Sequence, residues 1–296
     1  MSYEAKVLCD SITYPWPKRP KDGVRLTTLQ VTMPRIVLAE FNTHRVLSRN
    51  SASSRAIPVE KRIAMWEMTP FFPEAFLANQ RGMQAGEPLD YMLQQKAKST
   101  WLSACRSMIV HAQDLARLGV HKQWANRLLE PFAWHTVICS STEWENFYNL
   151  RRHKDAQPEI HHSADLMFEA QDKSIPLVLG PGDWHMPFLT DQDINESCGN
   201  PECKVDDAWL VKLSVARCAR VSYLTHDTNK RDTAADVALH DRLQASGHMS
   251  PFEHCAQVVD ERDEEDITPW IASNFSYPWK QYRKFLHGEA VFRGEQ

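Results

Sequence analysis

The chain has 296 residues, of which 43% are hydrophobic and 24% charged, enough apolar material for one large domain or two small ones. Its formal net charge of −4 gives no global positive field, so neither nucleic acid nor a membrane is expected as a partner, and any anion site must be built locally. No apolar run approaches the ~20 residues of a membrane span, the N-terminus lacks a signal pattern, and seven scattered cysteines suit a reducing compartment, so a cytoplasmic location is expected.

The first half of the chain predicts one strand and two helices. Residues 26–33 (LTTLQVTM) alternate between apolar and polar side chains, which predicts a half-buried strand that Pro34 ends or bends. A short helix is predicted at 58–67. Residues 89–119 give the clearest helical pattern in the chain, with Gly119 as its stop signal.

The second half mixes helical segments with an irregular one. Two further helices are predicted, at 141–152 and 156–170. The Pro-, Gly- and Asp-rich residues 174–207 predict an irregular connection or insertion. Residues 209–223 are predicted to begin as a strand, because apolar and polar side chains alternate at their start. Residues 232–246 predict an amphipathic helix that Gly247 stops.

The segment 43–55 (THRVLSRNSASSR) concentrates arginines and serines directly after an apolar run. Arginines that make bidentate bonds, with small hydroxyl donors around them, are what a nucleotide phosphate requires. A solvated loop is the plainer alternative, but few acidic residues neutralise these arginines. A nucleic-acid backbone is the rival anion, and the acidic chain without a basic stripe disfavours it. The pattern therefore indicates a local anion site.

Other candidate sites are weaker. Cys198 and Cys203 have the spacing of half a zinc site, but no second Cys/His pair matches them, so a turn is favoured and no metal is expected. His161 and His162 cannot share one helix face, which favours a surface position. The segment 247–254 (GHMSPFEH) places two histidines and a glutamate around a Ser-Pro turn. The usual phosphate-loop, dinucleotide, metalloprotease and esterase motifs are absent from the sequence.

Together, four segments resemble the signature motifs of the flavin-dependent thymidylate synthases. The family's R-H-R motif, followed by S, N, S and R at fixed intervals, is matched at His44, Arg45, Ser48, Asn50, Ser53 and Arg55. An arginine just before a Leu-Pro step is matched by Arg127. The family's N-F-x-x-L-R and A-Q-x-E-I are matched at Asn146, Leu150, Arg151, Gln157 and Glu159. Its A-A-R-V-S-Y and G-H-x-[TS]-P-F-E-H are matched by ARCARVSY at 216–223 and by GHMSPFEH at 247–254.

The order of these motifs is unusual. In the family the last pair normally comes first, whereas here it lies near the C-terminus. The chain is therefore expected to be a circularly permuted relative, which is tolerated where termini lie close together. The resemblance implies an α+β fold, a mostly antiparallel sheet flanked by long helices. It also implies a flavin- and nucleotide-binding part at 1–174, a connecting insertion at 175–208, and a permuted segment at 209–296 that completes the same domain.

The resemblance implies an enzyme that uses FAD, methylenetetrahydrofolate as one-carbon donor and NADPH as reductant to modify C5 of a pyrimidine deoxynucleotide monophosphate. No cysteine stands in the Pro-Cys-His context of a thiol nucleophile, so the protein's task is to position and polarise the reactants. Arg151 is the expected catalytic residue, stabilising charge on the pyrimidine ring. The implied nucleotide-binding residues are Glu40, Ser51, Ser53, Ser54, Arg55, Arg127, Leu150 and Arg151. The implied cofactor-binding residues are Thr43, His44, Arg45, Asn50, Asn146, Asp155, His248 and Ser250. A homotetramer with active sites between subunits is also implied.

Five positions depart from the family pattern. Thr43 replaces the first Arg of R-H-R, and Glu40 replaces the Gln three residues before it. Ser51 replaces the Glu after the motif Asn, and Ser54 replaces the Gly before the last Arg. Asp155 replaces the His before A-Q-x-E-I. Reductive methylation of dUMP to dTMP is the default prediction. Action on dCMP or formation of a 5-hydroxymethyl product is the alternative that these changes motivate. A non-catalytic nucleotide- or nucleic-acid-binding protein is the alternative from another class.

Overall fold

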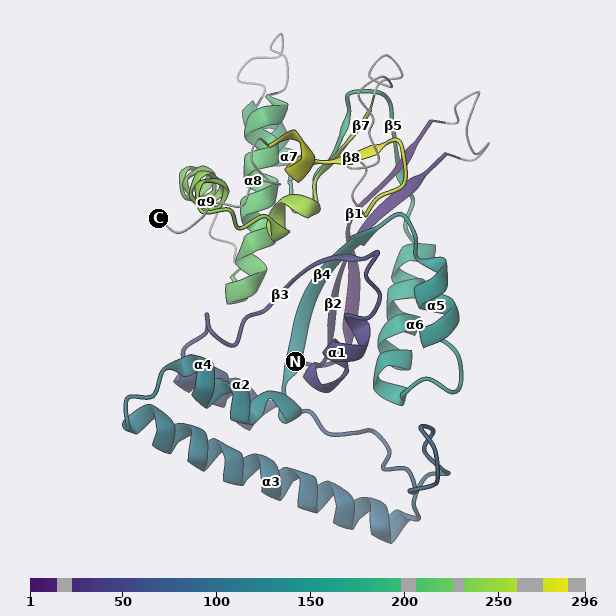
Figure 1. Cartoon of the computed structure of the whole chain (residues 1–296), viewed down its shortest axis with the longest axis vertical. Coiled ribbons are helices and arrows are strands. Elements are labelled where there is room, and N and C mark those ends of the chain that lie inside the picture. The colour runs from purple at the N-terminus through teal and green to yellow at the C-terminus, as the bar shows by residue number, and fades with distance from the viewer. Residues whose placement is uncertain (15–22, 198–205, 226–231, 260–273, 287–296) are drawn as a thin grey trace.

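The computed structural model describes residues 1–14, 23–197, 206–225, 232–259 and 274–286 (Figure 1). A five-stranded sheet in the order β3-β4-β2-β1-β5 forms its centre. The strands are β1 (Glu4–Thr13), β2 (Arg25–Pro34), β3 (Ser48–Ser51), β4 (Trp134–Ser141) and β5 (Leu177–Leu179). All neighbours in this sheet are antiparallel except β1 and β5, which run parallel. The mixed α+β architecture with a mostly antiparallel sheet agrees with the prediction.

The predicted strand at 26–33 is β2, and it ends at Pro34 as expected, but it is buried on both faces rather than half-buried. Its apolar face, which includes Leu29 and Val31, packs against α6 (Pro158–Asp172). The opposite face is polar and still buried, because its side chains find partners there. Thr28, for example, lies 2.6 Å from the Ser140 hydroxyl on β4. The hydroxyl-rich face is therefore internal.

The helices predicted in the first two-thirds of the chain are present. They are α2 (Val59–Met68), α3 (Tyr91–Arg117), α5 (Glu145–Arg151) and α6. The shorter elements beside them are η1 (Arg35–Val37), α1 (Leu38–Phe41), α4 (Lys122–Ala125) and η2 (Asn126–Phe132). Asp90 caps α3 by accepting a hydrogen bond from the Leu93 amide, and Gly119 follows its end with a φ of 77° that favours glycine. Among the described residues, no helix is both long enough and apolar enough to cross a membrane.

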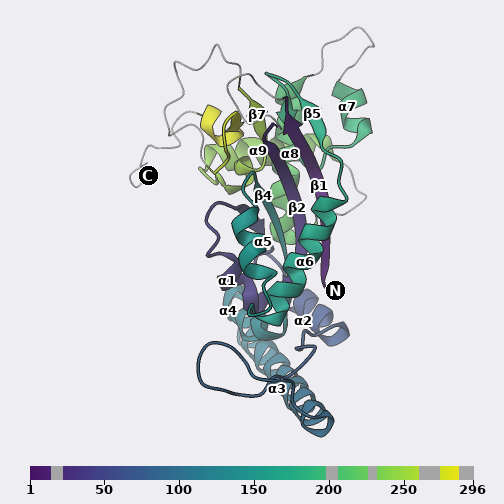
Figure 2. The ribbon, with the colours of Figure 1, turned by 90° about the vertical axis from the view of Figure 1, so that its right-hand side faces the viewer.

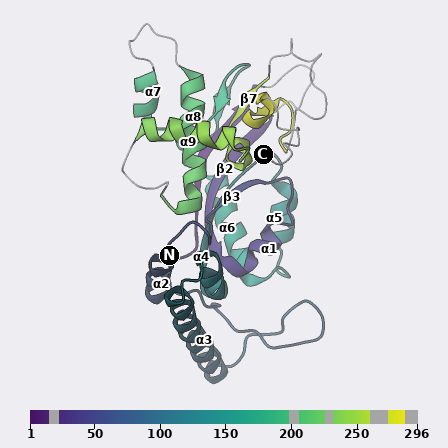
Figure 3. The same cartoon turned by 60° about the vertical axis from the view of Figure 1, so that its left-hand side comes forward.

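The helices form layers around the sheet. Figure 2 shows α5 and α6 in front of the central strands, while α8 (Asp207–Arg220) lies behind them. Figure 3 shows α9 (Thr233–Ala245) running across α8. Helices α2, α3 and α4 lie together beyond one end of the sheet, with α3 outermost (Figure 1). The sheet is thus covered on both faces, whereas α3 extends away from it.

The segment 209–223 does not begin as a strand; it forms α8 and the short η3 (Val221–Tyr223). Asp206 caps α8 by accepting a hydrogen bond from the Trp209 amide at 3.0 Å. Eight residues of α8 are buried, so apolar side chains occur around most of the helix and hide its 3.6-residue period. The helix predicted at 232–246 is α9, and Gly247 follows it with a φ of 74°.

A second, three-stranded sheet in the order β6-β7-β8 combines one strand that precedes α8 with two that follow α9. Its strands are β6 (Trp184–His185), β7 (Ala256–Val258) and β8 (Trp279–Gln281), with η4 (Ser250–Glu253) and η6 (Tyr282–Phe285) beside them. The region predicted as an irregular connection contributes β5, β6 and α7 (Asp191–Ser197). Asp193 of α7 makes two hydrogen bonds to Arg217 of α8, at 2.6 and 2.8 Å. That region is therefore anchored to the fold. Cys198 and Cys203 lie outside the described residues.

Candidate active site

Arg151 lies at the centre of a polar cluster that joins the end of α5 to α1 and the turn after it. Its Nε donates a hydrogen bond to Nε2 of His44 at 2.8 Å, and its Nη2 donates to the Thr43 hydroxyl at 3.3 Å. Its Nη1 donates to the carboxylate of Glu40 in an ion pair. Arg151 therefore meets three other predicted site residues that lie more than 100 positions before it in the sequence.

His44 orients this arginine from a buried position. His44 is 7% exposed, and its ring packs edge-on against the ring of Phe147, with 5.0 Å between the ring centroids. Burial lowers the pKa of His44, and the neighbouring charges of Arg151 and Arg49 lower it further. A neutral imidazole that accepts at Nε2 carries its proton on Nδ1. The ring therefore acts as a fixed acceptor for Arg151.

The Arg151 guanidinium keeps binding capacity after these contacts. It has five N–H donors, of which three are engaged within the cluster. Its side chain is 17% exposed and that of Glu40 is 30% exposed, so the pair faces solvent in part. The arrangement offers two oriented donors and a cationic plane beside a carboxylate acceptor. Such a site can bind an oxygen-rich planar ligand and stabilise negative charge on it.

The arginine- and serine-rich segment packs against the motif segments of the C-terminal third. Asn50 donates to the Cys218 carbonyl at 2.8 Å, and the Ser53 amide donates to the Ser222 carbonyl at 3.0 Å. Gln281 donates to both the Ser48 hydroxyl and the Glu253 carbonyl, at 2.8 and 2.9 Å, which ties β3 to η4. The segment 43–55 therefore lies beside the motif segments 216–223 and 247–254 within one chain.

The remaining predicted residues lie outside the Arg151 cluster. Ser54 turns its hydroxyl to Glu130 at 2.6 Å, and His248 pairs with the Ser246 hydroxyl at 2.8 Å. Ser51 lies half-buried in β3, and Asp155 is exposed. The other exposed residues are Arg45, Arg55, Arg127, Asn146, Leu150 and Ser250. Within the part of the chain that the structure describes, none of these makes a hydrogen bond to the Arg151 cluster.

A buried chain of hydroxyls and imidazoles was not anticipated. His185 lies 2.9 Å from the Ser11 hydroxyl and 2.8 Å from that of Thr28, and Ser140 continues the chain to His254 at 2.8 Å. Burial lowers the pKa of both histidines to about 3. The polar alternation in 26–33 is the one sequence signal for this chain, since its histidines come from distant segments.

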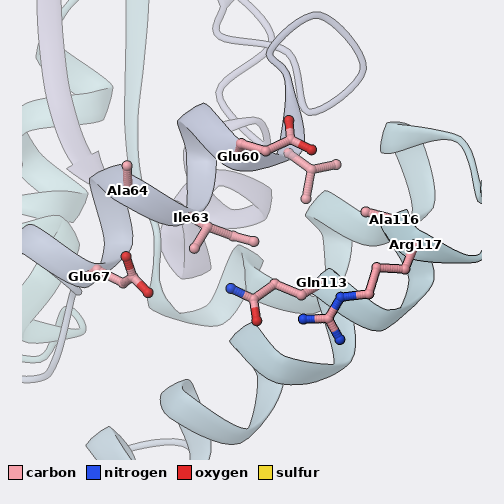
Figure 4. A pocket seen from close by; sticks show the side chains of 8 residues that line it. Glu60, Ile63, Ala64, Glu67, Gln113, Ala116 and Arg117 are labelled. Carbon is pink, nitrogen blue, oxygen red and sulfur yellow. The ribbon is translucent and has the colours of Figure 1, made fainter.

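Two of the surface hollows in the described part of the chain lie outside the Arg151 cluster. One, of about 460 Å³, lies between α2 and α3, where Glu60, Glu67, Gln113 and Arg117 surround Ile63 (Figure 4). The other, of about 600 Å³, lies beside α5 and α6. Its lining is Glu145, Tyr148, Asn149, Arg152, His153 and Phe168. Neither lining includes a predicted site residue.

Comparison with known proteins places this geometry in context. Residues 24–177, just over half of the chain, match the family model described as thymidylate synthase complementing protein. No curated protein sequence matches the chain.

The solved structures that match the chain share little sequence with it. A UMP/dUMP methylase, PolB from Streptomyces cacaoi, bound with 5-Br dUMP is 16% identical with a TM-score of 0.47, over 60% of this chain and 92% of that one. Its complex with 5-Br UMP gives 15% and 0.46, over 60% and 90%. Thymidylate synthase X from Helicobacter pylori, with FAD and dUMP, gives 15% and 0.37, over 49% and 67%. At these scores the family match alone establishes the relationship.

Proposed function

Because the chain belongs to the thymidylate synthase complementing protein family, we propose that it is an enzyme that transfers a one-carbon unit to C5 of a pyrimidine deoxynucleotide, with dUMP to dTMP as the default. When bound, FAD supplies the hydride, methylenetetrahydrofolate supplies the carbon, and NADPH reduces the flavin. The chain's own residues bind and orient the reactants.

The observation that carries this proposal is the placement of Arg151. His44, Glu40 and Thr43 hold its guanidinium and leave two N–H donors for a ligand. Donors fixed before the reaction begins are effective at stabilising charge that develops on a ring oxygen. We therefore assign Arg151 to the pyrimidine and its three partners to the orientation of Arg151.

The exposed arginines suit the other parts of the ligands. Arg55 and Arg127 are exposed, and an exposed guanidinium can take a nucleotide phosphate in a bidentate manner. Arg45, Asn146 and His248 are exposed as well and provide the donor types that the phosphates and ring edges of FAD require. This donor set fits the flavin, and we propose that these residues hold it.

We further propose that the active site is completed between subunits of a homotetramer. Arg55 and Arg127 make no hydrogen bond to the Arg151 cluster in the described single chain, so they are free to serve a neighbour's site. Helix α3 lies outermost in the molecule (Figure 1). Large apolar side chains on it are exposed. Tyr91 is 74% exposed, Met92 73%, and Leu118 just beyond the helix 78%. Such exposed apolar residues on one long helix favour burial by another copy.

A circular permutation remains our interpretation of the motif order. The matched region ends at residue 177, so the motif segments at 216–223 and 247–254 lie outside it. They nevertheless contact β3, through Asn50 and through the bridge from Gln281. A segment that moved along the chain but kept its place in the fold accounts for both facts.

The Glu40–Arg151 pair also favours a second candidate function, which is one-carbon transfer to a different pyrimidine or with a different product. The Glu40 carboxylate is an acceptor next to the proposed ring-binding arginine. An acceptor matches the exocyclic amine of cytosine as well as the N3–H of uracil. Modification of dCMP, or release of a 5-hydroxymethyl product, is therefore the alternative. A non-catalytic nucleotide- or nucleic-acid-binding protein is the alternative from another class.

One experiment separates these proposals. The purified protein is first examined for flavin absorbance and then incubated with FAD, NADPH, methylenetetrahydrofolate and either dUMP or dCMP. Mass spectrometry of the nucleotide distinguishes a methyl from a hydroxymethyl product. Bound flavin with turnover of either nucleotide supports the enzyme. A protein without flavin affinity that leaves both nucleotides unchanged refutes it and favours the binding role.

A further inference from the structure

Arg49 differs from the other two arginines of the arginine- and serine-rich segment. Those two are exposed, whereas Arg49 is half-buried in β3. Its neighbours on the strand, Ser48 and Asn50, make hydrogen bonds with residues of the C-terminal third. Successive side chains of a strand point to opposite faces of the sheet. Arg49 accordingly extends the other way, to the end of α1, where it meets the carbonyl of Phe41.

The Arg49 guanidinium holds the turn that follows α1. Its Nη1 donates to the His44 carbonyl at 3.0 Å and to the Phe41 carbonyl at 3.4 Å. The His44 carbonyl also accepts from the Leu47 amide at 3.2 Å, and the Phe41 carbonyl accepts from the His44 amide at 3.3 Å. One side-chain nitrogen thus joins both carbonyls that define the turn, so the arginine fixes the path of the backbone between them.

This turn carries the partners of Arg151. Glu40 directly precedes it, and Thr43 and His44 lie within it. A shift of the turn would therefore move all three partners of the Arg151 guanidinium together. A misplacement of about 1 Å at a reacting centre can cost about 10²-fold in rate, even when its cause lies away from the chemistry. The placement of the donors of Arg151 therefore depends on the turn that Arg49 holds.

Arg49 also contributes to the charge around His44. Among the described residues no carboxylate forms an ion pair with Arg49; Glu253 on η4 acts on its charge but pairs with another arginine. The second cation that faces the His44 ring is Arg151 on α5, which is paired with Glu40. Burial first, and then these two cations, lower the pKa of His44. The ring is thereby kept neutral, the form that accepts a hydrogen bond at Nε2.

We propose that Arg49 is a positioning residue for the one-carbon transfer, because it fixes the turn 41–44 and keeps His44 in the neutral form that orients Arg151. This inference rests on the proposed function, in which Arg151 acts on the pyrimidine. It goes beyond the motif resemblance, because Arg49 stands between the matched positions Ser48 and Asn50 and corresponds to neither. The effect of Arg49 on the reaction passes through His44 and Arg151.

Arg49→Met tests both parts of this role. Methionine keeps an apolar stem and removes the charge and both hydrogen bonds. We expect kcat to fall about tenfold, while KM for the nucleotide stays within about twofold because no ligand contact is lost. The acid limb of kcat should move to higher pH. Without the neighbouring charge His44 protonates more readily, and a protonated ring cannot accept from Arg151.

Arg49→Lys separates the charge from the hydrogen bonds. Lysine keeps the charge, but its ammonium lies one bond nearer the backbone than Nη1 of arginine and cannot bridge both carbonyls in the same way. We expect this variant to keep the wild-type acid limb and to lose part of kcat. Arg152→Met is the matched control, since this exposed arginine pairs with Asp165; it should keep both kcat and the acid limb.

Two kinetic outcomes overturn the inference. One is an Arg49→Met variant with the kcat and the acid limb of the wild type. The other is an Arg49→Lys variant with the kcat of the wild type, a result that remains decisive even if Arg49→Met fails to fold.

A measurement without turnover separates this inference from the proposed function. NMR of the ligand-free protein with isotope-labelled histidine follows the His44 ring against pH, and a His44→Gln variant identifies its signal. The ring should protonate at higher pH in Arg49→Met than in the wild type or in Arg49→Lys. If the wild type turns over but His44 titrates alike in all three proteins, the inference alone fails. If the wild type turns over neither dUMP nor dCMP, the proposed function fails, and the titration still shows whether Arg49 controls His44.

Discussion

Replacement of Arg151 by alanine should separate catalysis from folding. The variant loses an ion pair to Glu40 and hydrogen bonds to His44 and Thr43. The ion pair is partly exposed, so it contributes roughly 0–1 kcal/mol to stability, and the bond to His44 adds about 1 kcal/mol. A loss of about 1–2 kcal/mol in the free energy of unfolding is well within the usual 5–15 kcal/mol of a folded protein. The variant should therefore fold and retain flavin.

Its turnover should fall far more than its stability. Removing one donor that stabilises charge in a transition state lowers kcat by about 10²-fold or more. Arg151→Lys should recover only part of this loss, because lysine keeps the charge but lacks the planar fork of donors. Arg55→Ala should differ from both by raising KM for the nucleotide, since it removes a phosphate contact rather than a contact to the ring.

The assay is steady-state kinetics with the preferred nucleotide, together with flavin absorbance and urea unfolding for each variant. Arg152→Ala is the matched control, because this neighbouring arginine pairs with Asp165 and stacks on Phe168, outside the Arg151 cluster. It should turn over at close to the wild-type rate. An Arg151→Ala variant with wild-type turnover would refute the assignment and favour a non-enzymatic role.

Three further outcomes test other parts of the structure. Asp193→Ala should lower the free energy of unfolding by about 3–5 kcal/mol in urea, because it leaves Arg217 partly unpaired in a buried network; a loss below 1 kcal/mol would show that this ion pair does not anchor α7. His185 and His254 have a pKa of about 3 in the folded state and about 6.5 when unfolded. Below pH 6.5 the unfolded state therefore binds more protons than the folded state. The free energy of unfolding should fall by about 1.4 kcal/mol per pH unit for each histidine. Equal urea midpoints at pH 7 and pH 5 would contradict this. Burial raises the pKa of Cys255 to about 12, so iodoacetamide at pH 8 should leave this thiol unmodified until the protein is unfolded, and mass spectrometry of the peptide that contains it checks this.

The central strand illustrates what local sequence can and cannot predict. The alternation of Leu29 and Val31 with polar neighbours is a local signal, and it correctly predicts β2 and its buried apolar face. The burial of Thr28 depends on Ser140 and His185, which are 112 and 157 positions away in the sequence. Nothing within the strand shows that such partners exist, so the half-buried prediction was wrong for a reason that only the tertiary structure reveals.

Helix α8 shows the opposite difficulty, in which burial hides a local signal. Val211 and Val215 pack toward Phe252, while Cys218 packs toward Ile138 of β4, so more than one face of the helix is buried. An apolar stripe that covers most of a helix has no clear period, and a short stretch of it resembles the alternation of a strand. The Asp206 cap was the available sequence signal for a helix, and it stands three residues before the misassigned segment 209–223.

The Arg151 cluster also depends on contacts between distant parts of the sequence, and these contacts bear on the choice of substrate. The resemblance brought Arg151 together with the segment that follows α1, but it gave no reason to expect an ion pair there. Relative to the family pattern, Thr43 removes a positive charge and Glu40 adds a negative one, and both side chains contact Arg151. The surroundings of the arginine are therefore less positive by two charges than the motif prescribes. A partly neutralised guanidinium attracts an anionic ring less strongly, while the carboxylate beside it offers an acceptor for an amine. In the proposed enzyme, the choice between uracil and cytosine should accordingly follow Glu40, and the development of charge on either ring should follow Arg151.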